Sequence, residues 1–84
     1  MELLDTVELM VSDNYKNRMK AEYLQTKIRY DKLKTMCDKW DNGELDFEPT
    51  CPREIYNEQL NYMFSYLCVL EERAQLEGID LCKQ

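Results

Sequence analysis

Residues 14–41, NYKNRMKAEYLQTKIRYDKLKTMCDKWD, decide the fold. This stretch contains neither Gly nor Pro, and Asn14 is a favourable N-terminal cap. Apolar or uncharged side chains recur in it at alternating steps of four and three residues, which keeps one stripe facing a partner helix. The stripe consists of Met19, Tyr23, Thr26, Tyr30, Leu33, Cys37 and Trp40. Asn42 and Gly43 accept the left-handed conformation that ends a helix. We therefore predict one long helix over residues 14–41.

A second long helix is predicted over residues 52–77. Pro52 suits a first helical turn, and Gly78 ends the pattern, with Ile79 placed to fold back as the apolar contact of a Schellman ending. Its stripe has the same four-three spacing and consists of Tyr56, Leu60, Met63, Leu67, Leu70 and Ala74.

The rest of the chain connects and precedes these helices. A connector over residues 42–51 is long enough for the two helices to lie antiparallel, and we expect Leu45 and Phe47 to tuck beneath them. Residues 1–12 form a short amphipathic helix with Leu3, Leu4, Val7, Met10 and Val11 on one side. The sequence therefore predicts one all-α domain over residues 1–84: a short N-terminal helix followed by an antiparallel helical hairpin.

The second helix carries more apolar residues than one partner helix can cover. A hairpin buries a stripe roughly 100° wide, and additional apolar side chains surround the second helix: Ile55, Tyr62, Phe64, Tyr66, Cys68 and Val69. Exposed apolar surface of this extent is typical of self-association. We predict a homo-oligomer, either a dimer or a higher closed assembly such as a hexamer.

Charge is unevenly distributed along the chain. The net charge is −6, yet the stretch from Tyr15 to Asp41 holds eight bases and four acids. The overall acidity argues against binding long nucleic acid, while a local pocket can still attract a small anion. No apolar run is long enough to span a bilayer and no signal peptide is recognisable, so we expect a cytosolic protein. Four widely spaced cysteines and no histidine predict free thiols and no zinc site.

Catalysis is poorly supported by the composition. Without histidine the usual proton shuttle at neutral pH is missing, and with only Gly43 and Gly78 there is no Gly-rich phosphate loop. Cys37 falls on the predicted stripe and is expected to be a buried apolar residue rather than a nucleophile. We therefore expect no enzyme, no catalytic residue, no metal and no cofactor.

Tyrosines interleaved with bases make the first long helix the best candidate for a ligand site. Rings beside cations can hold an anion that also has a flat face, such as a nucleotide. The candidates are Tyr15, Arg18, Lys27, Arg29, Tyr30 and, on the second helix, Arg73. A structural interpretation stays open for each: bases can form the solvated face, Tyr30 lies on the stripe, and Arg73 can pair with Glu77 along its own helix.

The motif Tyr-Lys-x-Arg-Met-x-x-Glu-Tyr at residues 15–23 resembles the opening of a family of small phage proteins related to an open reading frame of crAss-like phages. The second half, from Glu58 through Met63 and Arg73 to Ile79, resembles the ending of such chains. The group is similar in size and layout to anti-CBASS protein 2 and, more distantly, to Thoeris anti-defence protein 1. The long, acidic connector with Trp40 and Phe47 departs from the family pattern.

This resemblance implies an oligomeric phage protein that acts in the host cytoplasm. Such proteins bind and sequester the cyclic di- or trinucleotides of bacterial anti-phage defence without cleaving them. In the family a tyrosine stacks on a nucleobase of the ligand. A basic side chain of the first long helix contacts a phosphate. The resemblance suggests Tyr15 and either Lys27 or Arg29 for these roles, and it places Arg73 at the family's arginine near the end of the second helix. The alternatives are an adaptor that binds a host protein through the apolar faces of the second helix, and a purely structural oligomer.

Overall fold

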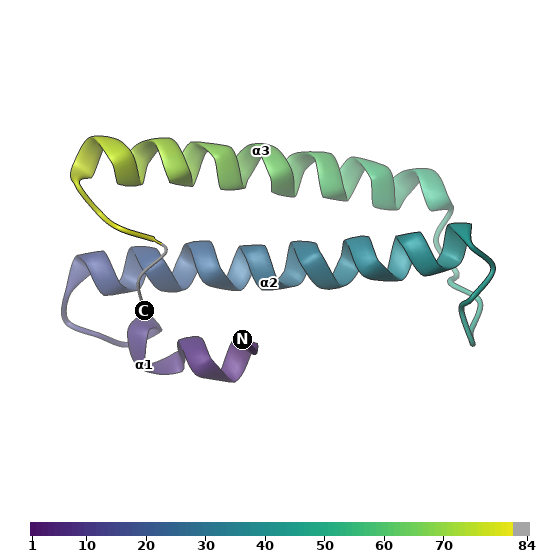
Figure 1. The fold of residues 1–84 in the computed structure, drawn as a ribbon, viewed down its shortest axis with the longest axis horizontal. Coiled ribbons are helices and arrows are strands. Elements are labelled where there is room, and N and C mark those ends of the chain that lie inside the picture. The colour runs from purple at the N-terminus through teal and green to yellow at the C-terminus, as the bar shows by residue number, and fades with distance from the viewer. Residues whose placement is uncertain (82–84) are drawn as a thin grey trace.

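Two long helices, α2 (Tyr15–Asp41) and α3 (Arg53–Glu77), make up most of the fold and lie side by side, running in opposite directions (Figure 1). A computed structural model describes residues 1–81. Two short elements precede the long pair, the 3-10 helix η1 (Leu3–Thr6) and the single-turn helix α1 (Val7–Met10). Residues 1–81 contain no strand, so the all-α prediction is confirmed for this part of the chain.

Helix α2 begins and ends where its local sequence favours it. The Asn14 side-chain oxygen accepts a hydrogen bond from the Lys16 backbone N–H at 2.8 Å, which satisfies one of the free donors of the first turn. At the other end Gly43 has φ +72°, and the Glu44 N–H donates to the Lys39 carbonyl at 2.8 Å. The 27 residues of α2 set the length of the molecule, whose longest dimension is 43 Å.

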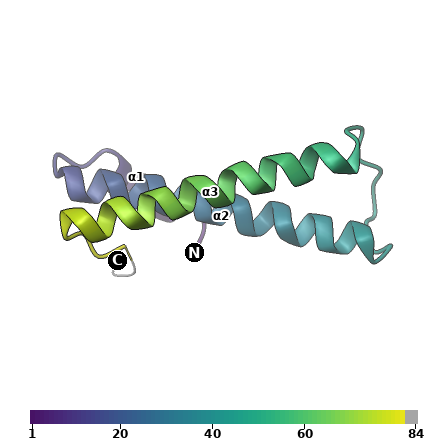
Figure 2. The ribbon, with the colours of Figure 1, turned by 90° about the horizontal axis from the view of Figure 1, so that it is seen from above.

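Helices α2 and α3 meet along the predicted stripes. On α3 the burial increases toward the C-terminus, since Leu67, Leu70 and Ala74 are buried while Tyr56 is half-buried. The two axes cross at a shallow angle and diverge toward the connector (Figure 2). The best-packed region therefore lies near the start of α2 and the end of α3, where the buried cluster is Met19, Leu70, Ala74, Ile79 and Leu81, with Tyr23 packed against it.

The end of α3 forms the predicted Schellman arrangement. Gly78 has φ +70°, a left-handed conformation that costs side-chain-bearing residues free energy. The Ile79 N–H donates to the Ala74 carbonyl at 2.8 Å, and the Ile79 side chain is buried in the core cluster. This turn folds the chain back over α3 and adds Ile79 and Leu81 to a small core.

The leading segment differs from the sequence prediction. Instead of one helix over residues 1–12, it consists of η1 and α1, and α2 lies between this segment and α3 (Figure 1). The predicted apolar side is wrong in its orientation, because Leu4, Val7 and Val11 are exposed. Thr6 is fully buried instead; its hydroxyl donates to the Leu3 carbonyl and accepts from the Gln25 amide at 2.9 Å. A 3-10 turn rotates successive side chains by more than an α-turn does, so the α-helical pattern misassigned the inner face.

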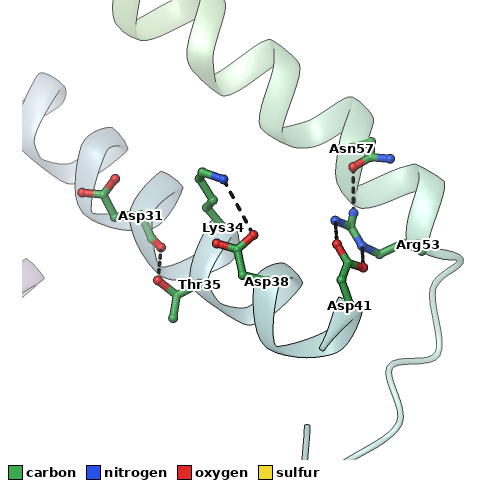
Figure 3. Close-up of polar contacts among 7 residues, drawn as sticks. All are labelled: Asp31, Lys34, Thr35, Asp38, Asp41, Arg53 and Asn57. Atoms are coloured by element: carbon green, nitrogen blue, oxygen red, sulfur yellow. Dashed lines mark hydrogen bonds and ion pairs between the residues drawn. The ribbon is translucent and has the colours of Figure 1, made fainter. Parts of the chain in front are cut away.

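The connector is fixed where it enters α3. Arg53 makes a two-point ion pair with Asp41, both nitrogen–oxygen distances being 3.1 Å, and donates to Asn57 at 2.7 Å (Figure 3). The same guanidinium lies 5.8 Å from the Trp40 ring, which meets Tyr56 edge-on at 5.7 Å. These contacts hold the open end of the α2–α3 pair together.

The two apolar residues of the connector are less buried than predicted. Leu45 is half-buried and Phe47 stays exposed. They do not lie beneath the helix pair. They line a hollow along one side of α2, together with Lys32, Met36 and Lys39.

Candidate functional site

One candidate residue pair lies on the side of the molecule where α2 meets the middle of α3. The Lys27 Nζ lies 5.8 Å from the centre of the Tyr30 ring, within the range of a cation–π contact. The Tyr30 ring in turn lies 6.3 Å from that of Phe64 on α3, at a tilt of 43°. Phe64 is exposed, so the pair of rings presents apolar surface to solvent beside a cation.

Other lysines share this side of α2. An α-helix turns about 100° per residue, so Lys16, Lys20, Lys27 and Lys34 project from one flank, which we call the lysine flank. Lys27 pairs with Asp31 at 2.8 Å and Lys34 with Asp38 at 3.7 Å, the latter seen in Figure 3. The Lys16 and Lys20 side chains have no hydrogen-bond or ion-pair partner among residues 1–81. The uncompensated positive charge of the flank therefore lies at Lys16 and Lys20, toward the start of α2, while the lysines nearer the Tyr30 ring are ion-paired.

A second group joins the start of α2 to the end of α3. The Tyr15 hydroxyl accepts a hydrogen bond from Arg73 Nη2 at 2.7 Å and donates one to Glu77 at 2.9 Å. Arg73 Nε also lies 3.4 Å from the Glu77 carboxylate, the intrahelical ion pair that the sequence spacing allows. The Tyr15 phenol raises the pKa of Arg73, and Glu77 adds to this effect, so the guanidinium stays charged. The structure thus brings together two candidates, Tyr15 and Arg73, with an acid that neutralises Arg73.

Arg18 and Arg29 stand apart from both groups. Arg18 Nη1 donates to the Ser12 carbonyl at 2.8 Å and closes the turn before α2. The Arg29 side chain has no hydrogen-bond or ion-pair partner among residues 1–81. It lies at the rim of a groove of about 420 Å³ between η1, α2 and α3, which is lined by Leu3, Arg29, Lys32, Leu33, Met36, Gln59 and Met63.

The groove beside Arg29 suits an anion less well than the lysine flank does. Its second cation, Lys32, is paired with Glu2 at 2.8 Å, and this pair lowers the pKa of the Glu2 carboxyl. No aromatic side chain lines it. Another hollow of about 460 Å³ at the end of α3 is rimmed by Glu71 and Asp80, whose charge repels anions.

The candidate residues thus separate into groups that the sequence alone did not distinguish. Lys27 and Tyr30 lie together, Tyr15 and Arg73 lie together, and Arg18 and Arg29 lie singly. Sequence reasoning missed Phe64 as a site residue and counted it only as surplus apolar surface. Phe64 lies next to the stripe residue Met63 but not on the stripe, and only the packing of α3 on α2 brings its ring to 6.3 Å from that of Tyr30.

Two other kinds of site are absent from the described residues. No helix within residues 1–81 is both long and apolar enough to cross a membrane. No group of three or more Cys, Asp or Glu side chains within the same range is arranged to hold a metal ion.

Comparison with known proteins gives one match. No curated protein and no solved structure matches the chain significantly. A family model described as Sequestin matches residues 13–76, which include α2, the connector and nearly all of α3. Because this match covers well over half of the sequence, the chain belongs to the Sequestin family.

Proposed function

We propose that the protein binds and sequesters a cyclic di- or trinucleotide second messenger of bacterial anti-phage defence, without cleaving it. It acts as a homo-oligomer of helical hairpins, a dimer or a hexamer, in the cytoplasm of the infected host. Membership in the Sequestin family supports this proposal through the family's name, which denotes sequestration. The resemblance of residues 15–23 to the phage anti-CBASS group supports the class of ligand.

The observation that carries the proposal is the contact of Lys27 with Tyr30 beside the exposed Phe64. A nucleotide offers a flat base and an anionic phosphate. Stacking of a base on an aromatic ring contributes roughly 1–3 kcal/mol, and a charge-assisted hydrogen bond contributes about 1.5–3 kcal/mol before ordering costs. In the proposed complex a base covers the two rings, and Lys27 exchanges Asp31 for a phosphate oxygen.

Sequestration fits what the side chains of this site can do. The sequence contains no histidine, so no imidazole is present to move a proton at neutral pH. Holding a ligand requires no proton transfer and no nucleophile, only affinity high enough to compete with the ligand's receptor. The lysine flank supplies positive charge for capture, and the rings supply contact area.

Calorimetric titration with a panel of cyclic di- and trinucleotides tests this function. Lys27→Ala removes the cation over the ring and is expected to weaken binding about tenfold or more, since a lost charge-assisted contact is worth at least about 1.4 kcal/mol. Lys34→Ala is the matched control: it removes an equivalent ion-paired lysine from the same flank, but one with no ring beneath it. Equal loss of affinity in the two variants would show that only the overall charge matters and would contradict the proposed site.

An adaptor function is the second candidate, because several large apolar residues of α3 are exposed. In that case the exposed face of α3 binds a host protein and no nucleotide is bound. A purified protein that captures one host partner stoichiometrically, and shows no affinity for any cyclic nucleotide, would favour the adaptor.

A further inference from the structure

The outward face of α3 carries a second regular stripe, different from the stripe of buried residues that packs on α2. Four exposed apolar residues follow one another at intervals of seven: Ile55 at 48% exposure, Tyr62 at 75%, Val69 at 52% and Leu76 at 81%. Gln59, Tyr66 and Arg73 fall between them, so that the complete stripe again alternates steps of four and three. This is the pattern with which a helix packs along another helix. We call this set of seven residues the outer stripe.

The four apolar residues of the outer stripe are placed symmetrically about the middle of the stripe. Ile55 and Leu76 lie equally far from the Ser65–Tyr66 peptide, and so do Tyr62 and Val69. Two copies of α3 that run antiparallel therefore place Ile55 opposite Leu76 and Tyr62 opposite Val69, each pair twice. A two-fold interface requires such self-complementarity, because the same patch serves both partners.

We propose that the outer stripe is the contact with a second copy of this chain, with the two α3 helices antiparallel about a two-fold axis at Ser65–Tyr66. The inference rests on the self-association that forms part of the proposed function, and it names the surface and the geometry.

Charge selects the antiparallel arrangement. The Glu58 side chain has no hydrogen-bond or ion-pair partner among residues 1–81, and it lies beside the outer stripe. Along the sequence, Glu58 is as far from Ser65 as Arg73 is from Tyr66. In the antiparallel pair, Glu58 of each copy faces Arg73 of the other, whereas a parallel pair places arginine against arginine. Arg73 uses Nη2 for Tyr15 and Nε for Glu77, so Nη1 is free among the described residues to receive this carboxylate.

The second copy thereby completes the group at the end of α3. Tyr15, Arg73 and Glu77 form one side, and Glu58 of the second copy forms the other. Phe64 projects from a different side of α3 than the outer stripe, so the contact leaves Lys27, Tyr30 and Phe64 open in both copies. Ligand binding and self-association are therefore separable by mutation.

Sedimentation of the purified protein without ligand tests the interface. Glu58→Arg places arginine against arginine twice and is expected to weaken self-association more than tenfold, while helical content in circular dichroism stays unchanged. Glu22→Arg reverses an exposed acid of α2, a helix that takes no part in the proposed contact, and is expected to leave self-association within about twofold. A monomeric wild-type protein, or equal effects of the two variants, overturns the proposal.

Disulfide trapping tests the direction of pairing independently. In a background with Cys51, Cys68 and Cys82 changed to Ser, Ser65→Cys is expected to cross-link to its own copy across the axis. Ile55→Cys alone is not expected to cross-link, but a mixture of Ile55→Cys with Leu76→Cys is. Self-cross-linking of Ile55→Cys indicates parallel helices, and absence of cross-linking from Ser65→Cys indicates another surface; either result overturns the proposal.

A failure of this interface is distinguishable from a failure of the proposed function. Sedimentation and cross-linking use no nucleotide, and the titrations with Lys27→Ala use no variant of the outer stripe. A protein that binds a cyclic nucleotide but pairs through another surface contradicts only the interface.

Discussion

The Tyr15 hydroxyl contacts two side chains of α3, Arg73 and Glu77, and so links the start of α2 to the end of α3. It accepts from Arg73 and donates to Glu77, so both sides of the oxygen are used. Tyr15→Phe keeps the ring and removes both hydrogen bonds. We expect Tm to fall by about 2–4 °C, the range typical of a small domain that loses a modest polar contact.

Tyr30→Phe is the matched control for this measurement. The Tyr30 hydroxyl makes no hydrogen bond within residues 1–81, and the Tyr30 ring keeps its contacts with Lys27 and Phe64 in the variant. Its Tm is expected to stay within about 1 °C of the wild-type value, because surface changes without partners have small effects. Equal Tm values for Tyr15→Phe and Tyr30→Phe would show that the Tyr15 hydrogen bonds add nothing to the stability of the fold.

The Asp41–Arg53 pair predicts a pH dependence of stability. The Arg53 guanidinium lowers the pKa of the Asp41 carboxyl below its ordinary value of 3.8. A group whose folded pKa is depressed contributes stability above its unfolded pKa and loses that contribution as the pH falls through the folded pKa. Thermal unfolding of wild type and Asp41→Asn is therefore expected to differ at pH 6 and to converge as the pH falls through the lowered pKa of Asp41. A difference in Tm that stays constant down to pH 2 contradicts this assignment.

At the residue level the sequence predicts contacts along one helix better than contacts between helices. The spacing of Arg73 and Glu77 alone allows the ion pair that the structure contains. The hydroxyl of Tyr15 reaches Arg73 across 58 residues of chain, and no local pattern specifies that contact. Likewise the pattern identified Lys27 and Tyr30 as candidates but could not choose them over Arg18 and Arg29. Which side of α2 faces α3 and which faces the leading segment is decided only when these elements pack together.

Among the contacts between the leading segment and α2, one involves a fully buried hydroxyl. Thr6 is fully buried and accepts from Gln25 at 2.9 Å. Thr6→Val keeps the shape and leaves the Gln25 amide without this acceptor, which is expected to cost about 1–2 kcal/mol. Thr35→Val is the control, because the exposed Thr35 hydroxyl bonds only the Asp31 carbonyl of its own helix (Figure 3). Urea unfolding measures both; a smaller loss for Thr6→Val than for Thr35→Val excludes this anchoring role.

The end of α3 depends on a left-handed glycine. An added Cβ at Gly78 meets nothing within 4 Å, so the cost of Gly78→Ala is conformational and not steric crowding by neighbours. We expect a loss of about 1 kcal/mol, measured by urea unfolding, because the left-handed conformation disfavours a side chain by roughly that amount. Unchanged stability would mean that residues 78–81 do not hold this turn in solution.

The long helices are predictable from sequence because each contains apolar residues at helical spacing and residues that favour helix ends at both of its termini. Residues 14–41 were expected to be helical and α2 spans Tyr15–Asp41; residues 52–77 were expected and α3 spans Arg53–Glu77. The leading segment is short, and its 3-10 turn does not follow the α-helical period, so Leu4 and Val7 were assigned to the wrong face. The connector depends on contacts such as Arg53 with Asp41, which become possible only after the helices pair.

For the whole molecule, the distribution of charge explains how an acidic chain can attract an anion. The lysine flank concentrates bases on one side of α2, while unpaired acids lie on α3 and the connector. Affinity for a nucleotide is therefore expected to fall as salt is raised, because exposed charges are screened beyond about 8 Å at physiological ionic strength. Titrations at 50 and 500 mM NaCl measure this, and salt-independent affinity would indicate that stacking alone holds the ligand.

The most direct test of sequestration is a single titration followed by recovery of the ligand. The purified protein is titrated with cyclic di- and trinucleotides, the complex is denatured, and the released nucleotide is identified by chromatography. We predict tight binding of at least one cyclic nucleotide, weakened by Lys27→Ala, and recovery of that nucleotide intact. Binding of none of them at micromolar concentration, or recovery of a linearised product, would contradict the account.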